Sequence, residues 1–313
     1  MRLDAATLPA AARALVERIG RTPLVELTLA ELPAGSRLFA KLESVNPGGS
    51  IKDRPVARML LEAWQAGTFA RGRRLLDSSS GNAGISYAML GAALGVGVTI
   101  VVPGNASRER LERMRAHGAE LVVTDPIEGY DFALREARRL ARADPERYWH
   151  CDQYSNCHNW LAHYDGTAGE IVAQLAERGL GPPDALVAGI GTGGTLTGAG
   201  RRLHELDPAL RVAAVIPETF PGIEGLKPYG EPGDIVPELL DEGLIDETCP
   251  VSADEAVAMC RRLAALGLFV GPSSGAFVHA ALRVATARRP ARLVTFLNDG
   301  GERYVSTGMW RRD

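Results

Sequence analysis

The sequence predicts an α/β fold with two domains and one cleft between them. Short apolar strands alternate with helices that end in glycine, which is typical of parallel β/α/β units covered on both faces. The length of 313 residues is enough for two domains of ordinary size. Between two such arrays lies DPERYWHCDQYSNCHNWLAHYDG, which is rich in aromatic, amide and histidine side chains and poor in periodicity. We therefore expect it to line the cleft at a domain junction.

The first array runs from about Leu38 to Asp125 and is followed by a helix near residues 132–143. The second begins near Ala185, includes GAGRRLHELDPALRVAAVIPE and ends with RLVTFLND. The charge-free run from 78 to 107 is long enough to cross a bilayer. Its segment MLGAALGVGVTIVVP, however, reads as a buried helix, a glycine stop and a β-branched strand that ends in proline. We therefore expect no membrane span.

The composition and net charge argue against several classes of protein. Hydrophobic residues make up 46% and charged residues 23%, which is typical of a globular protein. The net charge of -3 argues against a nucleic-acid groove. The N-terminus has no signal-peptide core, so we expect a cytoplasmic protein. The cysteines are too few and irregular for a disulfide framework. One stretch contains His150, Cys151, Cys157, His158 and His163, but the spacing of these residues is not that of a structural zinc site, so we expect no metal there.

A glycine loop, GIGTGGTLTGAGRR, follows the predicted strand DALVAG. Gly189, Gly191 and Gly194 match G-x-G-x-x-G, and the next strand ends in Glu218, as in a dinucleotide-binding fingerprint. The same glycines, with Thr192 and a following helix start, equally suit a cradle for one small phosphate. The loop alone does not decide between an NAD-dependent oxidoreductase and a phosphate-anchored cofactor.

Two further hydroxyl-rich loops precede helices. In LLDSSSGNAGISYAML the loop offers hydroxyl, amide and backbone N–H groups to a carboxylate, and the helix has a buried stripe of Ile85, Ala88, Met89 and Ala92. The second loop is GPSSGAF, at residues 271–277. A dehydrogenase has no need of three such loops.

Lys52 stands between a Pro-Gly-Gly turn and a helix, in NPGGSIKDRPV. With Asp53 as N-cap, Pro55 falls where its missing N–H costs nothing. The helix then buries a stripe of Val56, Met59, Leu60 and Ala63. Because an ammonium is disfavoured at the positive end of a helix, we expect the pKa of Lys52 to fall, which favours a nucleophilic, Schiff-base-forming amine.

Together these motifs resemble the fold-type II pyridoxal-phosphate enzymes, specifically the cysteine synthase and cystathionine β-synthase family. The resemblance covers nearly the whole chain and rests on six motifs in order: IGRTPLVEL, NPGGSIKDRP, SSGNAG, GTGGT, PSSGA and GERYVSTG. It implies two three-layer αβα domains with mostly parallel sheets and an active site in the cleft between them. The smaller domain would comprise residues 1–12 and 36–147, and the larger one 13–35 and 148–313.

The resemblance also implies roles for individual residues. Lys52 would hold pyridoxal 5'-phosphate as an internal aldimine and then act as acid and base at the substrate Cα. The cofactor phosphate would be bound by Gly191, Thr192, Gly193, Gly194 and Thr195. Asn82 would contact the ring hydroxyl and Ser273 the pyridine nitrogen. The substrate carboxylate would be held by Ser79, Ser80, Gly81 and Gln153.

A neutral serine at the pyridine nitrogen favours β-elimination over transamination. The implied reaction converts an O-acetyl- or O-phospho-L-serine, through an aminoacrylate, to L-cysteine with sulfide. The alternatives are cystathionine or 2,3-diaminopropionate formation, an NAD-dependent oxidoreductase, or an idle binding scaffold. Relatives are usually homodimers.

The sequence departs from the family pattern at Ala83, at Asp77-Ser78 and in LNDGGERY. The segment PGIEGLKPYG, at residues 221–230, is similar to the phosphoserine-using and cystathionine β-synthase-like branches. Lys227 in that segment is a candidate for binding a phosphate leaving group.

Overall fold

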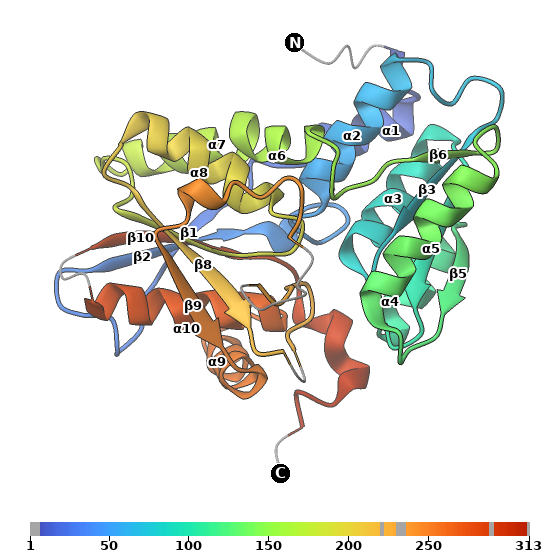
Figure 1. Cartoon of the computed structure of the whole chain (residues 1–313). Coiled ribbons are helices and arrows are strands. Elements are labelled where there is room, and N and C mark those ends of the chain that lie inside the picture. Colours follow the sequence, from blue (N-terminus) through green and yellow to red (C-terminus); the bar gives the residue numbers. More distant parts are fainter. Residues whose placement is uncertain (1–6, 220–221, 230–235, 288–290, 312–313) are drawn as a thin grey trace.

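The computed structural model describes residues 7–219, 222–229, 236–287 and 291–311. These residues form two sheets with helices on both faces, and the sheets lie in two bodies side by side (Figure 1). The predicted α/β class with mostly parallel sheets is confirmed. The terminal residues of both predicted domains, and the two end residues of PGIEGLKPYG, lie outside the described ranges.

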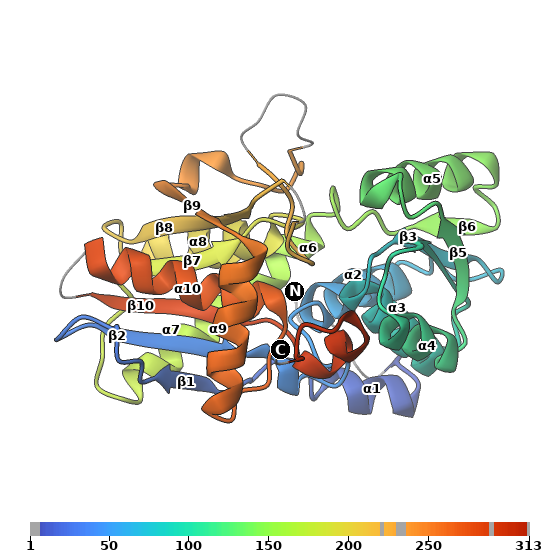
Figure 2. The same cartoon turned by 90° about the horizontal axis from the view of Figure 1, so that it is seen from below.

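The larger sheet has six strands in the order β1-β2-β10-β7-β8-β9. Every neighbouring pair is parallel except β1 and β2, which are antiparallel. Helices α9 and α10 cover one face, and α7 and α8 cover the other (Figures 1 and 2). The strands are β1 (Leu24–Leu27), β2 (Arg37–Leu42), β7 (Ala185–Gly189), β8 (Arg211–Pro217), β9 (Glu247–Val251) and β10 (Arg292–Leu297). The helices are α7 (Ala168–Ala176), α8 (Gly194–Leu206), α9 (Ala253–Ala265) and α10 (Pro272–Ala287).

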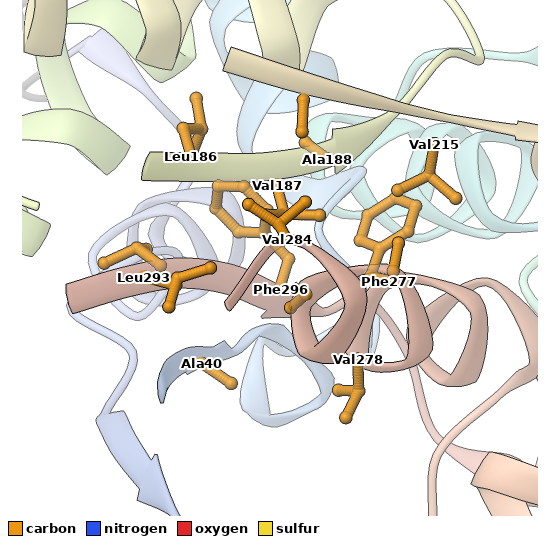
Figure 3. Packing of buried hydrophobic residues seen from close by; sticks show 14 of the residues in the cluster. Ala40, Leu186, Val187, Ala188, Val215, Phe277, Val278, Val284, Leu293 and Phe296 are labelled. Atoms are coloured by element: carbon orange, nitrogen blue, oxygen red, sulfur yellow. The ribbon is translucent and has the colours of Figure 1, made fainter. Parts of the chain in front are cut away.

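The central strand β10 illustrates why this sheet forms. Its residues 293–297 are all buried, which is the continuous apolar pattern of a parallel strand covered on both faces. Phe277 and Val284 of α10 pack near Phe296 of β10 and Val187 of β7 (Figure 3). Since β10 is buried along its length, the residues that follow it start from a fixed position.

The smaller sheet has four parallel strands in the order β5-β4-β3-β6. Helix α5 covers one face and α3 the other, with α1, α2 and α4 packed around α3. The strands are β3 (Arg74–Ser78), β4 (Val98–Pro103), β5 (Glu120–Thr124) and β6 (Tyr148–His150). The helices are α1 (Ala10–Val16), α2 (Asp53–Gln65), α3 (Asn82–Leu94), α4 (Arg108–Ala116) and α5 (Gly129–Ala143).

Sheet membership differs from the predicted domain boundaries at two places. Strand β2 follows residue 36 but pairs with β1 and β10 of the larger sheet. Strand β6 follows residue 147 but pairs with β3 of the smaller sheet. A short apolar strand does not reveal its partner, because pairing is decided by the tertiary arrangement.

The stretch expected to be irregular at the domain junction is partly helical. It contains β6, then α6 (His158–Ala162) and the π-helix η3 (His163–Thr167), which continues into α7. The remaining short elements are the 3₁₀ helices η2 (Glu43–Val45), η4 (Glu242–Leu244) and η5 (Gly301–Thr307). No helix in the described part of the chain is long and apolar enough to span a membrane.

Two local predictions were wrong. Helix α2 begins at Asp53 with Lys52 at the N-cap position, so Asp53 is not the cap. The Asp53 carboxylate instead accepts hydrogen bonds from Gly48 N and Ser86 Oγ, both at 2.5 Å. Pro55 still lies in the first turn, where its missing N–H costs no bond, and the predicted stripe of α2 is buried. In α3, Ala92 is exposed although Leu94 in the same turn is buried, so Ala92 lies on the solvent-facing side of the helix.

Candidate active site

A cavity of about 480 Å³ lies between the two sheets and takes its lining from both bodies. A smaller cavity of about 40 Å³ shares Lys52, Asn82, Gly191 and Thr192 with it. Most of the predicted site residues line one or both. The larger cavity is lined by Lys52, Ser79, Ser80, Asn82, Gln153, Gly191, Thr192 and Lys227, and the smaller one also by Gly193, Thr195 and Ser273. Gly81 and Gly194 line neither, although both stand at helix starts beside the cavities.

Lys52 presents its amine to both cavities. The amine has no hydrogen-bond or ion-pair partner among the described residues, while the Lys52 backbone N–H donates to Ser50 Oγ at 3.2 Å. Burial lowers the pKa of Lys52 from 10.5 to about 8, and the nearby carboxylate of Asp299 opposes this shift. The direction of the shift was predicted from the helix dipole, but its main cause is loss of solvent.

The loop and helix on either side of Lys52 are anchored by buried charges. Arg54 donates to Glu43 and to Glu170, both at 2.7 Å. Lys41 donates to Glu170 at 2.7 Å and is fully buried. The network joins the start of α2 to β2, η2 and α7, and thereby fixes Lys52 relative to the larger sheet.

Lysine occurs in this sequence only at positions 41, 52 and 227. Lys41 is held in the buried network, and Lys227 is paired with Asp131 at 2.6 Å. Lys52 is therefore the lysine whose amine is available inside the cavities.

The asparagine loop follows β3 and opens α3. Ser79 Oγ accepts hydrogen bonds from the backbone N–H groups of Gly81 and Gly84, at 3.1 and 2.8 Å. A Cβ on Gly81 would collide with the side chain of Arg110, so only glycine fits there. Asn82 Nδ2 donates to Asp299 at 2.7 Å, while Asn82 Oδ1 is buried without a partner. An unpartnered buried oxygen at a cavity wall indicates space for a polar ligand.

The glycine loop lies between β7 and α8. Gly193 has a φ of 81°, which favours glycine. A Cβ on Gly191 would lie 2.9 Å from the carbonyl oxygen of Gly225, so there is no room for a side chain at this position. Thr195 Oγ1 lies 3.2 Å from His163 Nε2. The loop thus keeps its backbone open at the start of α8, which suits a phosphate.

Ser273 lies in the first turn of α10, across the small cavity from the asparagine loop. Its hydroxyl oxygen accepts a hydrogen bond from Asn298 Nδ2 at 3.0 Å. Asn298 follows β10 directly and lines the same cavity.

Two ion pairs connect the segment 222–228 with the helices of the smaller body. Glu224 pairs with Arg110 of α4 at 2.5 Å, and Lys227 pairs with Asp131 of α5. Lys227 Nζ also lies 5.4 Å from the ring centroid of Tyr154. The positive charge of Lys227 at the cavity is therefore compensated by the carboxylate of Asp131.

Several residues at the site were missed by the sequence reasoning: Arg110, Tyr130, Asp131, Tyr154, Glu224, Asn298 and Asp299. For Asn298 and Asp299 a signal existed, because polar residues that directly follow a buried parallel strand stand at the edge where ligands bind. Arg110 lies in an ordinary charged helix and gave no signal. Among the described residues, no group of three or more His, Cys, Asp or Glu side chains could hold a metal ion.

Comparison with known proteins agrees with this geometry. Residues 15–299 match the family of pyridoxal-phosphate dependent enzymes, and the chain belongs to that family. It is 42% identical to a cysteine synthase of Aquifex aeolicus over 95% of this chain and 91% of that protein. The predicted family and cofactor are thereby confirmed, and the NAD-dependent alternative has no support.

Solved structures with the same fold include two enzymes whose names refer to O-substituted serines. A crystal structure of O-ureido-L-serine synthase superimposes with a TM-score of 0.86 at 35% identity, covering 95% of this chain and 94% of that one. The O-acetylserine dependent cystathionine β-synthase of Helicobacter pylori has a TM-score of 0.83 at 34% identity, covering 95% and 98%.

The lowered pKa of Lys52 gives a testable expectation. Only the neutral amine reacts with acetic anhydride, so acetylation of Lys52 in the cofactor-free protein should rise with pH through a midpoint near 8. Peptide mass spectrometry at a series of pH values measures it. In the denatured chain, where the amine is solvated, the midpoint should move to about 10.5. Equal midpoints in the two states would contradict the effect of burial.

Proposed function

We propose that the protein catalyses β-replacement on an O-activated L-serine, O-acetyl- or O-phospho-L-serine, with sulfide to give L-cysteine. The observation that carries the proposal is the available amine of Lys52, which faces a glycine cradle on one side and a hydroxyl-rich loop on the other. Similarity to a cysteine synthase over most of both chains supports the same reaction.

The residues present fit pyridoxal 5'-phosphate. The small cavity is lined by glycines at which a Cβ would collide with neighbouring atoms, so their backbone stays uncovered, and Asn82 Oδ1 is buried without a hydrogen-bond partner among the described residues. When bound, this cofactor supplies an aldehyde for an amine and a ring that accepts electron density from the substrate. Lys52 would hold it, and the backbone and hydroxyls of Gly191, Thr192, Gly193, Gly194 and Thr195 would bind its phosphate.

The remaining roles follow from position. Ser79, Ser80 and Gln153 line the larger cavity and would hold the substrate carboxylate, with Gly81 shaping their loop. Gln153 Nε2 donates to Ser78 O at 2.7 Å with one of its two hydrogens, so its second hydrogen and the serine hydroxyls are the donors that remain for the carboxylate. Asn82 would contact the ring hydroxyl and Ser273 the ring nitrogen.

Lys52 would also move the proton of the reaction. Its pKa of about 8 allows the amine to take a proton from the substrate Cα and to return it at neutral pH. The bond between Cβ and the leaving oxygen breaks, and a bond between Cβ and sulfur forms. Proton removal and return balance, so no external oxidant or reductant is needed.

A homocysteine nucleophile, which would give cystathionine, is the second candidate. It is favoured by the structural likeness to an O-acetylserine dependent cystathionine β-synthase. We further propose that the protein is cytoplasmic, because its four cysteines are too few and too irregularly spaced for a disulfide framework, and that it is a homodimer, which rests on the family resemblance alone.

A substrate panel tests the reaction. The cofactor-loaded protein is incubated with O-acetyl-L-serine, O-phospho-L-serine or L-serine, each with sulfide or L-homocysteine, and the products are separated by chromatography. We expect L-cysteine from an activated serine and sulfide, with L-serine the poorest donor because hydroxide leaves badly. Product from homocysteine alone would favour the second candidate, and no product from any pair would overturn both.

Lys227 provides a test of the leaving group. If its ammonium binds a donor phosphate, Lys227→Ala should lower kcat/KM for O-phospho-L-serine by roughly tenfold or more, which is typical for loss of a charge-assisted hydrogen bond. O-acetyl-L-serine should be little affected. The matched variant Asp131→Asn releases the same ammonium from its ion pair and should preserve O-phospho-L-serine turnover. Equal losses on both donors in Lys227→Ala would exclude this role.

A further inference from the structure

Asn298 occupies a position that the proposed reaction leaves without a role. It is the first residue after β10 and is 8% exposed, and it shares the small cavity with Ser273. Its backbone N–H donates to Ser274 Oγ at 2.8 Å, and its side-chain Nδ2 donates to Ser273 Oγ at 3.0 Å. Because β10 is buried on both faces, the backbone of Asn298 is fixed, and its side chain holds Ser273 in one position.

The direction of the bond between Asn298 and Ser273 decides what Ser273 can offer to a ligand. A hydroxyl has one hydrogen to donate and lone pairs to accept. Since Asn298 donates to the Ser273 oxygen, the Ser273 hydrogen remains available. Within the described ranges of the chain, Ser273 Oγ donates no hydrogen bond of its own, so its hydrogen is free to point into the small cavity.

The surroundings of Ser273 disfavour a cation at the same place. Ser273 is the second residue of α10, a helix of 16 residues whose N-terminus faces the cavity with partial positive charge. The nearby Asp299 lines neither cavity; its Oδ2 accepts from Asn82 at 2.7 Å and from Tyr304 at 2.6 Å, and its Oδ1 is buried without a hydrogen-bond partner in the described part of the chain. A neutral acceptor thus fits next to Ser273 better than a protonated nitrogen.

We propose that Asn298 is a positioning residue, which fixes Ser273 as a hydrogen-bond donor and so selects the unprotonated form of the cofactor's ring nitrogen. The inference rests on the proposed function, because it assumes that Ser273 faces this nitrogen. An unprotonated ring withdraws electrons less strongly, so Asn298 would help to restrict the enzyme to replacement at Cβ and to suppress transamination.

The protonation state of the nitrogen can be observed directly. The holoenzyme is prepared with pyridoxal 5'-phosphate carrying ¹⁵N in the ring, and the ¹⁵N chemical shift is measured by NMR. We expect the wild type to show an unprotonated nitrogen. In Asn298→Asp a carboxylate of the same shape accepts the Ser273 hydrogen, so that Ser273 can only accept from the ring. The signal should move toward the protonated form, and formation of pyridoxamine 5'-phosphate from amino-acid substrates should rise.

Two further variants separate positioning from a general loss of structure. Asn298→Ser is smaller and should give a shift between those of the wild type and Asn298→Asp, because Ser273 is no longer held in one direction. Asn156→Ala removes a half-buried amide that donates to Cys151 O and lines neither cavity, and it should leave the ¹⁵N shift unchanged.

Two results would overturn the inference. One is a protonated nitrogen in the wild type, which decides the question even if no variant folds. The other is an unchanged shift in both Asn298 variants while the cofactor is bound. Failure of the chain to bind the cofactor at all would instead refute the proposed function on which the inference rests.

Discussion

The site depends on the buried charge network that fixes the start of α2. Arg54 connects Glu43 with Glu170, and Glu170 in turn receives Lys41. Removing one member of such a buried network costs about 3–5 kcal/mol, because its partners keep a charge without compensation. Arg54 is two residues from Lys52. Because the network attaches Arg54 to the larger body, the backbone of Lys52 is held in a fixed position relative to that body. At the other end of the loop, the backbone oxygen of Gly48 accepts from Arg303 of η5, and η5 packs against α4 (Figure 2).

Electrostatics at Lys52 then follow from burial. The amine loses solvent, and its pKa falls. Burial also raises the pKa of two neighbouring carboxyl groups. The pKa of Asp53 rises to about 6, and the pKa of Asp299 is raised as well. Carboxyl groups that ionise less readily stabilise an adjacent ammonium less. The pocket thus combines an amine that is easily neutral with hydrogen-bond donors at the glycine loop, and this combination suits an enzyme that binds an anionic cofactor and moves a proton at carbon.

Much of the fold could be predicted from local pattern. The glycine stop and β-branched run of residues 95–103 identified the end of α3 and strand β4, because no tertiary information is needed to see them. The sheet to which β2 belongs could not be predicted, since its partner β10 is about 250 residues away in sequence. The prediction that Asp53 caps α2 was wrong, because its carboxylate accepts hydrogen bonds from Gly48 and Ser86. The prediction that Ala92 is buried was wrong because the tertiary packing leaves its side of α3 in solvent. For the site, glycine and serine motifs identified the loops. Asn298 and Asp299 could have been found from their place directly after β10, whereas Arg110 acts through contacts between distant segments and became visible only in three dimensions.

The most direct test of the account is the site of covalent attachment. The cofactor-loaded protein is reduced with borohydride, digested and mapped by mass spectrometry. We expect a phosphopyridoxyl group on Lys52 and on neither Lys41 nor Lys227. A group found on either of these lysines, or on none, would contradict this expectation.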